Sequence, residues 1–336
     1  MIVSRRPAIA TLLVFALAMV LPACGSSDSD ELTLYSGRIE PIIGPAIKRF
    51  EDGPAGKTVK VRYGDSPALA AQISEEASNS PADLFFAQDA GSLDAVEKRD
   101  LLEPLPADIL AKVPKHYQSA EGKWIGVTGR SRVIAYGPKV KRSELPDSPL
   151  KLTEPQWKGR VGWAPTNASL QGYITALRLI EGEDVAKRWL EGMVRNDVQP
   201  YDSNIPVRDA IAKGEIDVGL INHYYVAEAV AEDPDYPVKV HFPPKDLGSL
   251  VNTAGIGVLA SSKHKKEALG FVRAMLSKGT QTYFADSSKE YPLLAGVPIP
   301  NELTPLDEIP SPKIDLAKLG GLEGTLKLLR ETGALG

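Results

Sequence analysis

The stretch Asp217-Val218-Gly219-Leu220-Ile221-Asn222-His223-Tyr224-Tyr225 decides how the rest of the chain is interpreted. An apolar, partly β-branched run ends in a polar residue, a histidine and two adjacent tyrosines, and residues 226–230 then resemble the first turns of a helix. A buried strand that leads into a helix is the unit of a parallel α/β sheet. Ligands of such sheets bind beyond the carboxyl ends of the strands. The sequence therefore predicts that Tyr224 and Tyr225 end this strand at a binding site.

The tyrosine pair also indicates what binds there. Neighbouring tyrosines most often pack as half-buried aromatic residues, because their rings are amphipathic. Two phenol oxygens that converge at a strand end instead suit a hard cation. A free tyrosine keeps its proton up to a pH of about 10. Only a strongly Lewis-acidic ion such as Fe³⁺ would deprotonate a pair of them at neutral pH, and its binding would depend on pH.

The first 31 residues have the pattern of an export and anchoring segment. Arg5 and Arg6 precede an apolar stretch, residues 8–21, that is too short to span a bilayer comfortably, so residues 1–23 are predicted to be a signal peptide. Leu21-Pro22-Ala23 before Cys24 resembles the lipobox of bacterial lipoproteins, which implies that Cys24 becomes a lipidated N-terminus. Residues 24–31 then form a lipidated, flexible tether. Because Cys24 is the only cysteine, disulfides within the chain are excluded.

Charge and composition narrow the class of protein further. Without Arg5 and Arg6 the net charge is near −6, and the sequence contains no basic block. A nucleic-acid partner is therefore not expected. A mature length of about 310 residues with 43% hydrophobic residues predicts two domains.

Polar residues follow three successive strands predicted near the start of the mature chain. The strands cover residues 32–35, 59–63 and 83–87. Arg38 and Glu40 follow the first strand, and Gln88 and Asp89 follow the third. If these strands are parallel, the polar residues line one crevice.

The next part of the chain contains a predicted crossing segment and a helix start. Residues 124–136 are predicted to be one long extended segment that crosses between two lobes. After a strand at residues 160–163, small polar residues begin a helix that continues through Ile180. Such residues most often cap the helix, but the same geometry also makes an anion site. Further elements are expected as a helix over 207–212, a strand over 256–259, a helix over 265–276, a loop over 305–312 and closing helices over 314–332.

Several short motifs, taken in order, resemble one known family. They are Tyr35-Ser36-Gly37, Pro81-Ala82-Asp83, Gly129-Arg130-Ser131-Arg132-Val133, Trp157-Lys158-Gly159, Asn222-His223-Tyr224-Tyr225 and Glu290-Tyr291-Pro292-Leu293. From Leu32 onward the chain resembles the bacterial periplasmic ferric-ion-binding proteins, the solute receptors of iron ABC importers. The resemblance implies an α/β, two-lobed periplasmic-binding-protein fold (type II) with iron in the cleft and closure on binding. The implied N-lobe is 32–130 with 255–304, and the C-lobe is 131–254 with 305–336.

The resemblance also implies a binding site, with some departures. Tyr224 and Tyr225 match the iron ligands of the family. A synergistic phosphate, carbonate or other small anion is implied at Thr166, Asn167, Ala168, Ser169, Asn204 and Asn222. Arg38, Arg62 and Arg130 are expected either to hold this anion or to form interlobe ion pairs.

The departures concern the half of the coordination sphere that the first lobe supplies. Ile39 stands where the family often has a histidine ligand, and Gln88 stands where it often has a glutamate. An additional tyrosine ligand of anion-independent members is absent near residues 168–169. Glu40, Gln88 and Asp89 remain as candidate metal ligands, with water and an anion as the alternative. His223 is a weaker candidate, because adjacent side chains usually point elsewhere.

The sequence thus favours a ferric-iron receptor that delivers its ligand to an ABC permease. The protein is expected to be a monomer on the extracytoplasmic side, held to the membrane only by its lipid anchor. A receptor for a ferric chelate, thiamine, a polyamine or an oxyanion remains the alternative. An enzyme is not expected, because the chain has no Gly-x-Ser-x-Gly elbow and no His-Glu-x-x-His motif, and its four histidines are scattered.

Overall fold

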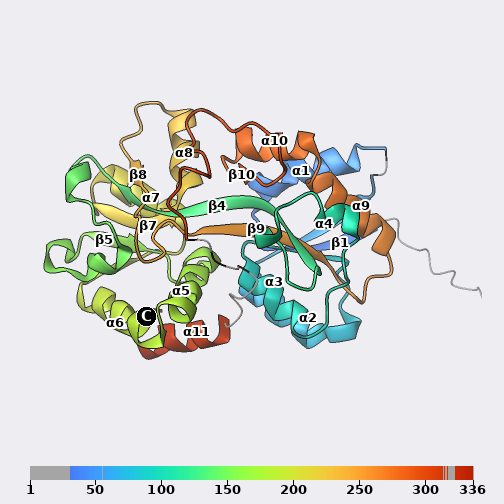
Figure 1. Cartoon of the computed structure of the whole chain (residues 1–336), viewed down its shortest axis with the longest axis horizontal. Helices are drawn as coiled ribbons and strands as arrows, with labels where there is room; N and C mark the ends of the chain where they lie inside the picture. The colour runs from blue at the N-terminus through green and yellow to red at the C-terminus, as the bar shows by residue number, and fades with distance from the viewer. Residues whose placement is uncertain (1–30, 55, 313, 315, 317–321, 336) are drawn as a thin grey trace, which may run out of the picture. The chain divides into compact units, whose positions relative to one another are not determined.

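The longest strand, β4 (Trp124–Tyr136), lies within a 10-stranded sheet (Figure 1). The computed structural model describes residues 31–54, 56–312, 314, 316 and 322–335, so the predicted signal peptide and Cys24 lie outside the described residues. Within them the strand order is β2-β1-β3-β9-β4-β7-β5-β6, and β8 and β10 also pair with β4. The other strands are β1 (Glu31–Ser36), β2 (Thr58–Tyr63), β3 (Leu84–Ala87), β5 (Val161–Trp163), β6 (Gln199–Pro200), β7 (Val218–Asn222), β8 (Lys239–His241), β9 (Val251–Val258) and β10 (Tyr291–Pro292).

Strand β4 changes its partner halfway along its length. It pairs antiparallel with β9 as far as Ser131, opposite Val251, and with β7 from Arg132, opposite Asn222. Figure 1 shows β4 and β9 running side by side. All 13 residues of β4 are buried. The predicted extended segment over 124–136 is confirmed, and the assignment of residues to two lobes stays a prediction.

Helices follow most of the parallel strands, which gives an α/β fold. β1 pairs parallel with β2 and β3, and β5 pairs parallel with β6 and β7. The helices are α1 (Glu40–Glu51), α2 (Ser66–Glu76), α3 (Ala90–Glu97), α4 (Ala107–Leu110), α5 (Ala168–Ile180), α6 (Glu183–Arg195), α7 (Asn204–Lys213), α8 (His223–Glu232), α9 (Lys265–Met275), α10 (Lys278–Ser287) and α11 (Leu322–Glu331). Short 3₁₀ turns are Ala77–Asn79, Lys115–Tyr117, Arg142–Glu144, Pro149–Thr153 and Pro155–Trp157. Of the predicted closing helices over 314–332, residues 315 and 317–321 lie outside the described residues. The prediction is confirmed for α11 and is wrong for Ile314, which is not helical.

One predicted boundary is wrong at the functionally important place. The tyrosine pair was expected to end the strand, with the helix beginning at Val226. Instead β7 ends at Asn222 and α8 begins at His223, so Tyr224 and Tyr225 lie in the first helical turn. Asn222 has the extended backbone of an N-cap residue (φ −90°, ψ 149°), a position that favours asparagine. Negative charge on the tyrosines would therefore be stabilised by the positive end of the helix dipole.

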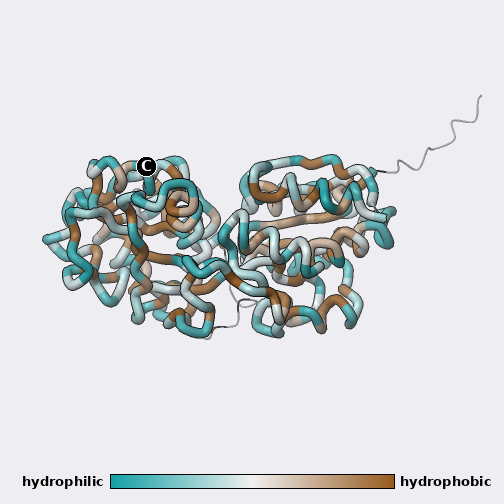
Figure 2. The backbone as a smooth tube through the Cα atoms, turned by 90° about the horizontal axis from the view of Figure 1, so that it is seen from above, coloured by the Kyte–Doolittle hydropathy of each residue, from teal (hydrophilic) through white to brown (hydrophobic). Residues whose placement is uncertain are grey.

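The apolar core covers both faces of the sheet. On one face Trp189 packs edge-on against Trp163 and Tyr173, with ring centroids 6.0 and 5.6 Å apart. On the other, Phe50 packs against Phe271 at 5.0 Å. Figure 2 shows the hydrophobic residues concentrated in interior segments, with hydrophilic residues on many outer turns. Among the helices of the described residues, none has both the length and the apolar character needed to span a bilayer.

Candidate functional site

Tyr224 and Tyr225 line a cavity of about 510 Å³. Its lining comes from the segments after β1, β2 and β3 and from the starts of α5, α7 and α8. These residues are Gly37, Arg38, Ile39, Ile42, Tyr63, Gly64, Asp65, Gln88, Thr166, Asn167, Asp202, Ser203, Ile205, Tyr224 and Tyr225. The prediction that the polar strand ends converge on one crevice is confirmed for Arg38 and Gln88. The volume lies within the range of about 300–1,000 Å³ that is usual for small-molecule sites.

Tyr224 and Tyr225 lie side by side at the base of α8. Their ring centroids are 4.2 Å apart with an interplanar angle of 37°, and Tyr224 is fully buried. The Tyr224 hydroxyl has no hydrogen-bond partner among the described residues, and an unsatisfied buried hydroxyl costs about 1–3 kcal/mol. Burial raises the pKa of Tyr224 well above its ordinary value, and Tyr225 adds to the rise. A bound cation would supply the partner that this oxygen lacks.

Arg38 places a permanent positive charge beside these phenols. Its Nη2 donates to Glu290 Oε1 at 2.7 Å, and both side chains are buried. Burial disfavours the charged form of Arg38, but Glu290, Tyr224 and Tyr225 together outweigh it, and the pKa lies above its ordinary value. Arg38 is expected either to bind an anion or to form an ion pair, and the structure shows the ion pair with Glu290. Its guanidinium also lowers the pKa of Tyr224 and so partly offsets the effect of burial.

Strand β4 places two more buried guanidinium groups near the tyrosine pair, although neither lines the cavity. Arg130 is 1% exposed, and its Nε donates to Ser169 Oγ at 3.1 Å. Its Nη1 and Nη2 atoms have no partner in the part of the chain that the structure describes. Arg132 donates from Nη2 to the Leu220 carbonyl, and burial lowers its pKa to about 9, which leaves it charged at neutral pH. The free Nη pair of Arg130 is a fork that matches an oxyanion.

Three of the residues predicted to hold an anion are buried polar residues: Ser169, Asn222 and Asn204. Ser169 Oγ accepts from Arg130 and from Asn222 Nδ2, the latter at 3.0 Å, so these three form one buried cluster. Asn204, the first residue of α7, is fully buried, and both its side-chain polar atoms are unpaired within the described residues.

The remaining residues of this prediction are structural or peripheral. Asn167 is the N-cap of α5 and accepts from Ser169 N at 3.0 Å, so here the capping alternative holds. Ala168 is the buried first residue of α5, and Thr166 is exposed at the cavity lining. Arg62 is exposed and lies over the Tyr35 ring, 5.4 Å from its centroid, outside the lining.

The candidate metal ligands of the first lobe lie in different environments. Gln88 is half-buried and lines the cavity, whereas Glu40 is exposed in the first turn of α1 and does not line it. Asp89 is the N-cap of α3, and its two oxygens accept from Ser92 N and Ser92 Oγ at 2.8 and 2.9 Å. Ile39 lines the cavity and is 49% exposed. No group of three or more His, Cys, Asp or Glu side chains in the described residues has the arrangement of a metal site.

His223 is not available as a ligand. It is buried, and both ring nitrogens contact backbone groups, Ser131 N at 3.2 Å and Lys289 O at 3.0 Å. Sequence reasoning missed Glu290 and Arg132 as parts of the site, although both occur in the motifs quoted above. It also missed Tyr63 and Ile205, which are exposed apolar residues of the lining.

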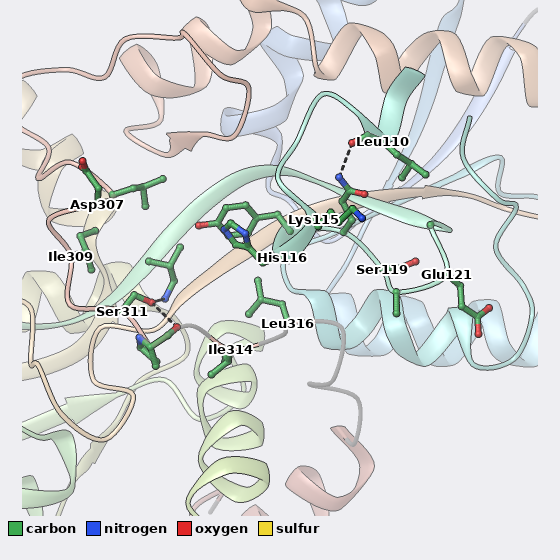
Figure 3. A pocket seen from close by; sticks show the side chains of 17 residues that line it. Leu110, Lys115, His116, Ser119, Glu121, Asp307, Ile309, Ser311, Ile314 and Leu316 are labelled. Atoms are coloured by element: carbon green, nitrogen blue, oxygen red, sulfur yellow. Dashed lines mark hydrogen bonds between the residues drawn. The ribbon is translucent and has the colours of Figure 1, made fainter. Parts of the chain in front are cut away.

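A second, larger cavity of about 1110 Å³ is lined by Leu110, residues 115–122, Val251 and parts of 306–316 (Figure 3). The rings of His116 and Tyr117 contact each other there, with centroids 4.1 Å apart. Ser311 Oγ accepts from Val251 N at 3.0 Å and closes one side. The two cavities share no lining residue, so the second is separate from the tyrosine pair.

Comparison with known proteins places these features in context. Residues 36–282 match the family described as bacterial extracellular solute-binding protein. The chain is 32% identical to an Fe(3+)-binding periplasmic protein of Serratia marcescens over 329 residues, which covers 96% of each chain. The structure resembles that of iron-bound HitA from Pseudomonas aeruginosa, with a TM-score of 0.85, 36% identity and coverage of 90% of this chain and 99% of that one. It also resembles a Trichodesmium protein in complex with iron and citrate, with a TM-score of 0.76, 30% identity and coverage of 90% and 99%.

Proposed function

Because the chain belongs to the bacterial extracellular solute-binding protein family, we propose that it is an extracytoplasmic receptor for ferric iron. The observation that carries this proposal is the buried Tyr224 hydroxyl, which lies beside Tyr225 at a helix N-terminus and lacks a hydrogen-bond partner in the described part of the chain. Phenolate oxygens suit a hard, strongly Lewis-acidic cation. In this proposal Tyr224 and Tyr225 bind Fe³⁺, and Gln88, water or an anion completes the coordination.

The charges of the site support a co-bound anion. Arg38, Arg130 and Arg132 are buried cations, and the buried carboxylates near them are Glu290 and Asp89. Two exposed carboxylates, Asp65 and Asp202, also line the cavity. A ferric ion added to such a site needs a negatively charged companion.

Phosphate or carbonate is the simplest such companion. The free Nη atoms of Arg130 and the unpaired amide of Asn204 are the donors that best fit an oxyanion, and Ser169 and Asn222 hold Arg130 and its surroundings in place. Charge-assisted hydrogen bonds of this kind are roughly twice as strong as neutral ones.

A ferric chelate is the second candidate, and a separate observation favours it. Three large apolar side chains of the lining, Ile39, Tyr63 and Ile205, are exposed to solvent. They lie after β1, at the end of β2 and at the start of α7, so they border the cavity from distant parts of the sequence. Such a border suits the hydrocarbon part of an organic polycarboxylate, whose oxygens would replace the ligands missing at Ile39 and Gln88.

The wider proposals follow from membership in a receptor family. We propose no catalytic role for this chain, and delivery of the iron to an ABC permease. We also propose that Cys24 carries a lipid that holds a monomeric receptor on the extracytoplasmic face of the membrane. The two-lobed division predicted from the sequence belongs to this proposal as well.

The test is to purify the protein from iron-replete cells and to measure bound metal, visible absorption and the masses of released small molecules. The proposal predicts about one iron per chain and a visible charge-transfer band from tyrosinate to iron. Inorganic anions without an organic acid support the first candidate, and a stoichiometric polycarboxylate supports the second. Protein that binds no iron and shows no band after incubation with ferric salts contradicts both.

A further inference from the structure

His223 connects the tyrosine pair to two distant parts of the backbone. The Ser131 amide is a donor, so His223 Nδ1 accepts at 3.2 Å, and the Lys289 carbonyl is an acceptor, so Nε2 carries the proton and donates at 3.0 Å. The ring also stacks on Tyr291, with centroids 4.5 Å apart and an interplanar angle of 17°. The imidazole is thus fixed as one neutral tautomer with no free nitrogen.

The first contact lies where β4 changes partner. Ser131 is the last residue of β4 that pairs with β9, and Arg132 is the first that pairs with β7. The Ser131 amide therefore bonds to a side chain on α8 at the point where the strand leaves one neighbour for the next. This contact ties the first turn of α8 to the crossing strand.

The second contact holds an unusual backbone conformation. Lys289 has φ +52°, in the left-handed region that is unfavourable for residues other than glycine. The carbonyl of this residue is the acceptor for His223. The next residue is Glu290, whose carboxylate holds Arg38 at 2.7 Å. The position of Lys289 therefore sets where the Arg38–Glu290 pair lies.

These contacts form a continuous series that begins beside Tyr224 in the sequence and returns to the phenols of Tyr224 and Tyr225. His223 adjoins Tyr224 in sequence and fixes Lys289, Lys289 orients Glu290, and Glu290 holds the guanidinium of Arg38, which acts electrostatically on Tyr224 and Tyr225. Resting on the proposed ferric function, we propose that His223 is a positioning residue. Through Lys289 and Glu290, it sets the positive charge beside the iron-binding phenolates and thereby tunes iron affinity and the tyrosinate–iron charge-transfer energy.

Three substitutions separate the contacts of His223. His223→Gln can place an amide donor near the Nε2 position and keep the bond to Lys289, while His223→Asn can place an amide oxygen near the Nδ1 position and keep only the bond to Ser131. His223→Phe keeps a ring against Tyr291 and loses both bonds. We expect the Gln variant to keep the parent band and affinity. The Asn and Phe variants should shift the band and lower ferric affinity about 10- to 100-fold, as changes in outer-shell partners of a metal ligand do.

A double variant tests whether the effect passes through Glu290. Glu290→Gln should shift the band in the same direction as His223→Asn, and the combined variant should shift it no further than the larger single change, because residues that act through one network are not additive. His241→Asn is the matched control, since His241 also contacts a carbonyl, that of Pro146 at 3.0 Å, and does not line the site. It should leave the band and the affinity unchanged.

The possible results distinguish failure of the proposed ferric function from failure of the role proposed for His223. A parent protein that gives no band with ferric iron refutes the proposed function and this inference with it. A parent that gives the band, with Asn and Phe variants that keep its position and affinity while only their melting temperatures fall, overturns the inference alone. Additive shifts in the double variant overturn the route through Glu290. If the Phe variant does not fold, the comparison of Asn with Gln decides.

Discussion

Arg130 is a buried residue with two guanidinium nitrogens that form no hydrogen bond within the described residues. It is buried on β4, only its Nε is hydrogen-bonded within the described residues, and burial lowers its pKa. A second cation, Arg38, lowers it further. Such a group is stabilised when an oxyanion binds to its two free nitrogens.

The first prediction concerns this residue. Arg130→Gln should lower ferric affinity about 10- to 100-fold when phosphate or carbonate is present, and should reduce the difference between anion-supplied and anion-stripped protein. The ferric affinity of Arg130→Lys should lie between those of the parent and the Gln variant. Lysine keeps the positive charge but cannot donate two parallel hydrogen bonds to an oxyanion as a guanidinium does. Iron titrations with and without added anion measure both effects. An unchanged dependence on anion in the Gln variant would remove Arg130 from the anion site.

Tyr224 predicts how binding depends on pH. Burial raises its pKa well above the ordinary value, so the free protein holds this proton throughout the neutral range. Iron binding to the phenolate must release it. Apparent ferric affinity should therefore rise with pH, by about tenfold per pH unit for each proton released. Competition titrations between pH 5.5 and 7.5, corrected for ferric hydrolysis, measure the slope, and a flat profile would mean that no phenol ionises on binding.

At the scale of single elements, strands were easier to predict than the start of α8. The long apolar run of β4 was located correctly, because its hydrophobic pattern extends over the whole strand. The start of α8 was misplaced by three residues, because two aromatic residues after an apolar run fit a strand as well as a helical turn. Asparagine is common at the N-cap position, so Asn222 is the residue in the sequence that indicates this boundary. In the structure its side chain donates to Ser169 Oγ and forms no capping hydrogen bond.

The candidate site was only partly predictable for a related reason. The tyrosine pair belongs to a local motif and Gln88 directly follows a predicted strand, and the structure brings them to one cavity. The pairing of Arg38 with Glu290 joins residues 252 positions apart, and no local pattern specifies it. Asp89 shows the opposite difficulty, since a carboxylate after a strand is equally suited to a metal and to the start of the next helix.

Two substitutions separate these two roles for Asp89. Asp89→Ala removes the cap of α3 and should destabilise the protein by about 1 kcal/mol. Asp89→Ser, which keeps a capping oxygen without a carboxylate, should recover most of that loss. Both variants should bind ferric iron as the parent does. Thermal unfolding measures the first effect and iron titration the second, and a loss of affinity in the Ser variant would restore Asp89 as a ligand.

At the scale of the whole molecule, ligand binding and stability are linked. The cavity is lined by segments from 37–88 and 166–225, so a ligand that contacts both holds distant parts of the chain together. Iron with its anion should stabilise the fold by about 2.7 kcal/mol at a free concentration 100 times the Kd. The melting temperature should then rise with free ferric concentration, and an unchanged value under saturating iron would contradict binding to the folded state.

The proposed anchor makes a separate prediction for the whole molecule. Cys24→Ala should move the protein from the membrane fraction to the soluble extracytoplasmic fraction, because no other part of the proposal holds it to the membrane. Its iron binding should be unchanged, since the site lies within residues 37–290. Retention in the membrane fraction would show that the attachment does not depend on Cys24.

The most direct test of the account is the visible spectrum of iron-loaded protein with both tyrosines replaced by phenylalanine. Phenylalanine keeps the rings packed and removes only the two oxygens, so a double Tyr224→Phe, Tyr225→Phe variant should fold with a melting temperature near that of the iron-free parent. The account predicts that this variant shows no charge-transfer band and loses high-affinity ferric binding, while each single variant shows a weakened or shifted band. A double variant that binds ferric iron as tightly as the parent, with the same spectrum, would contradict the assignment of Tyr224 and Tyr225 as the iron ligands.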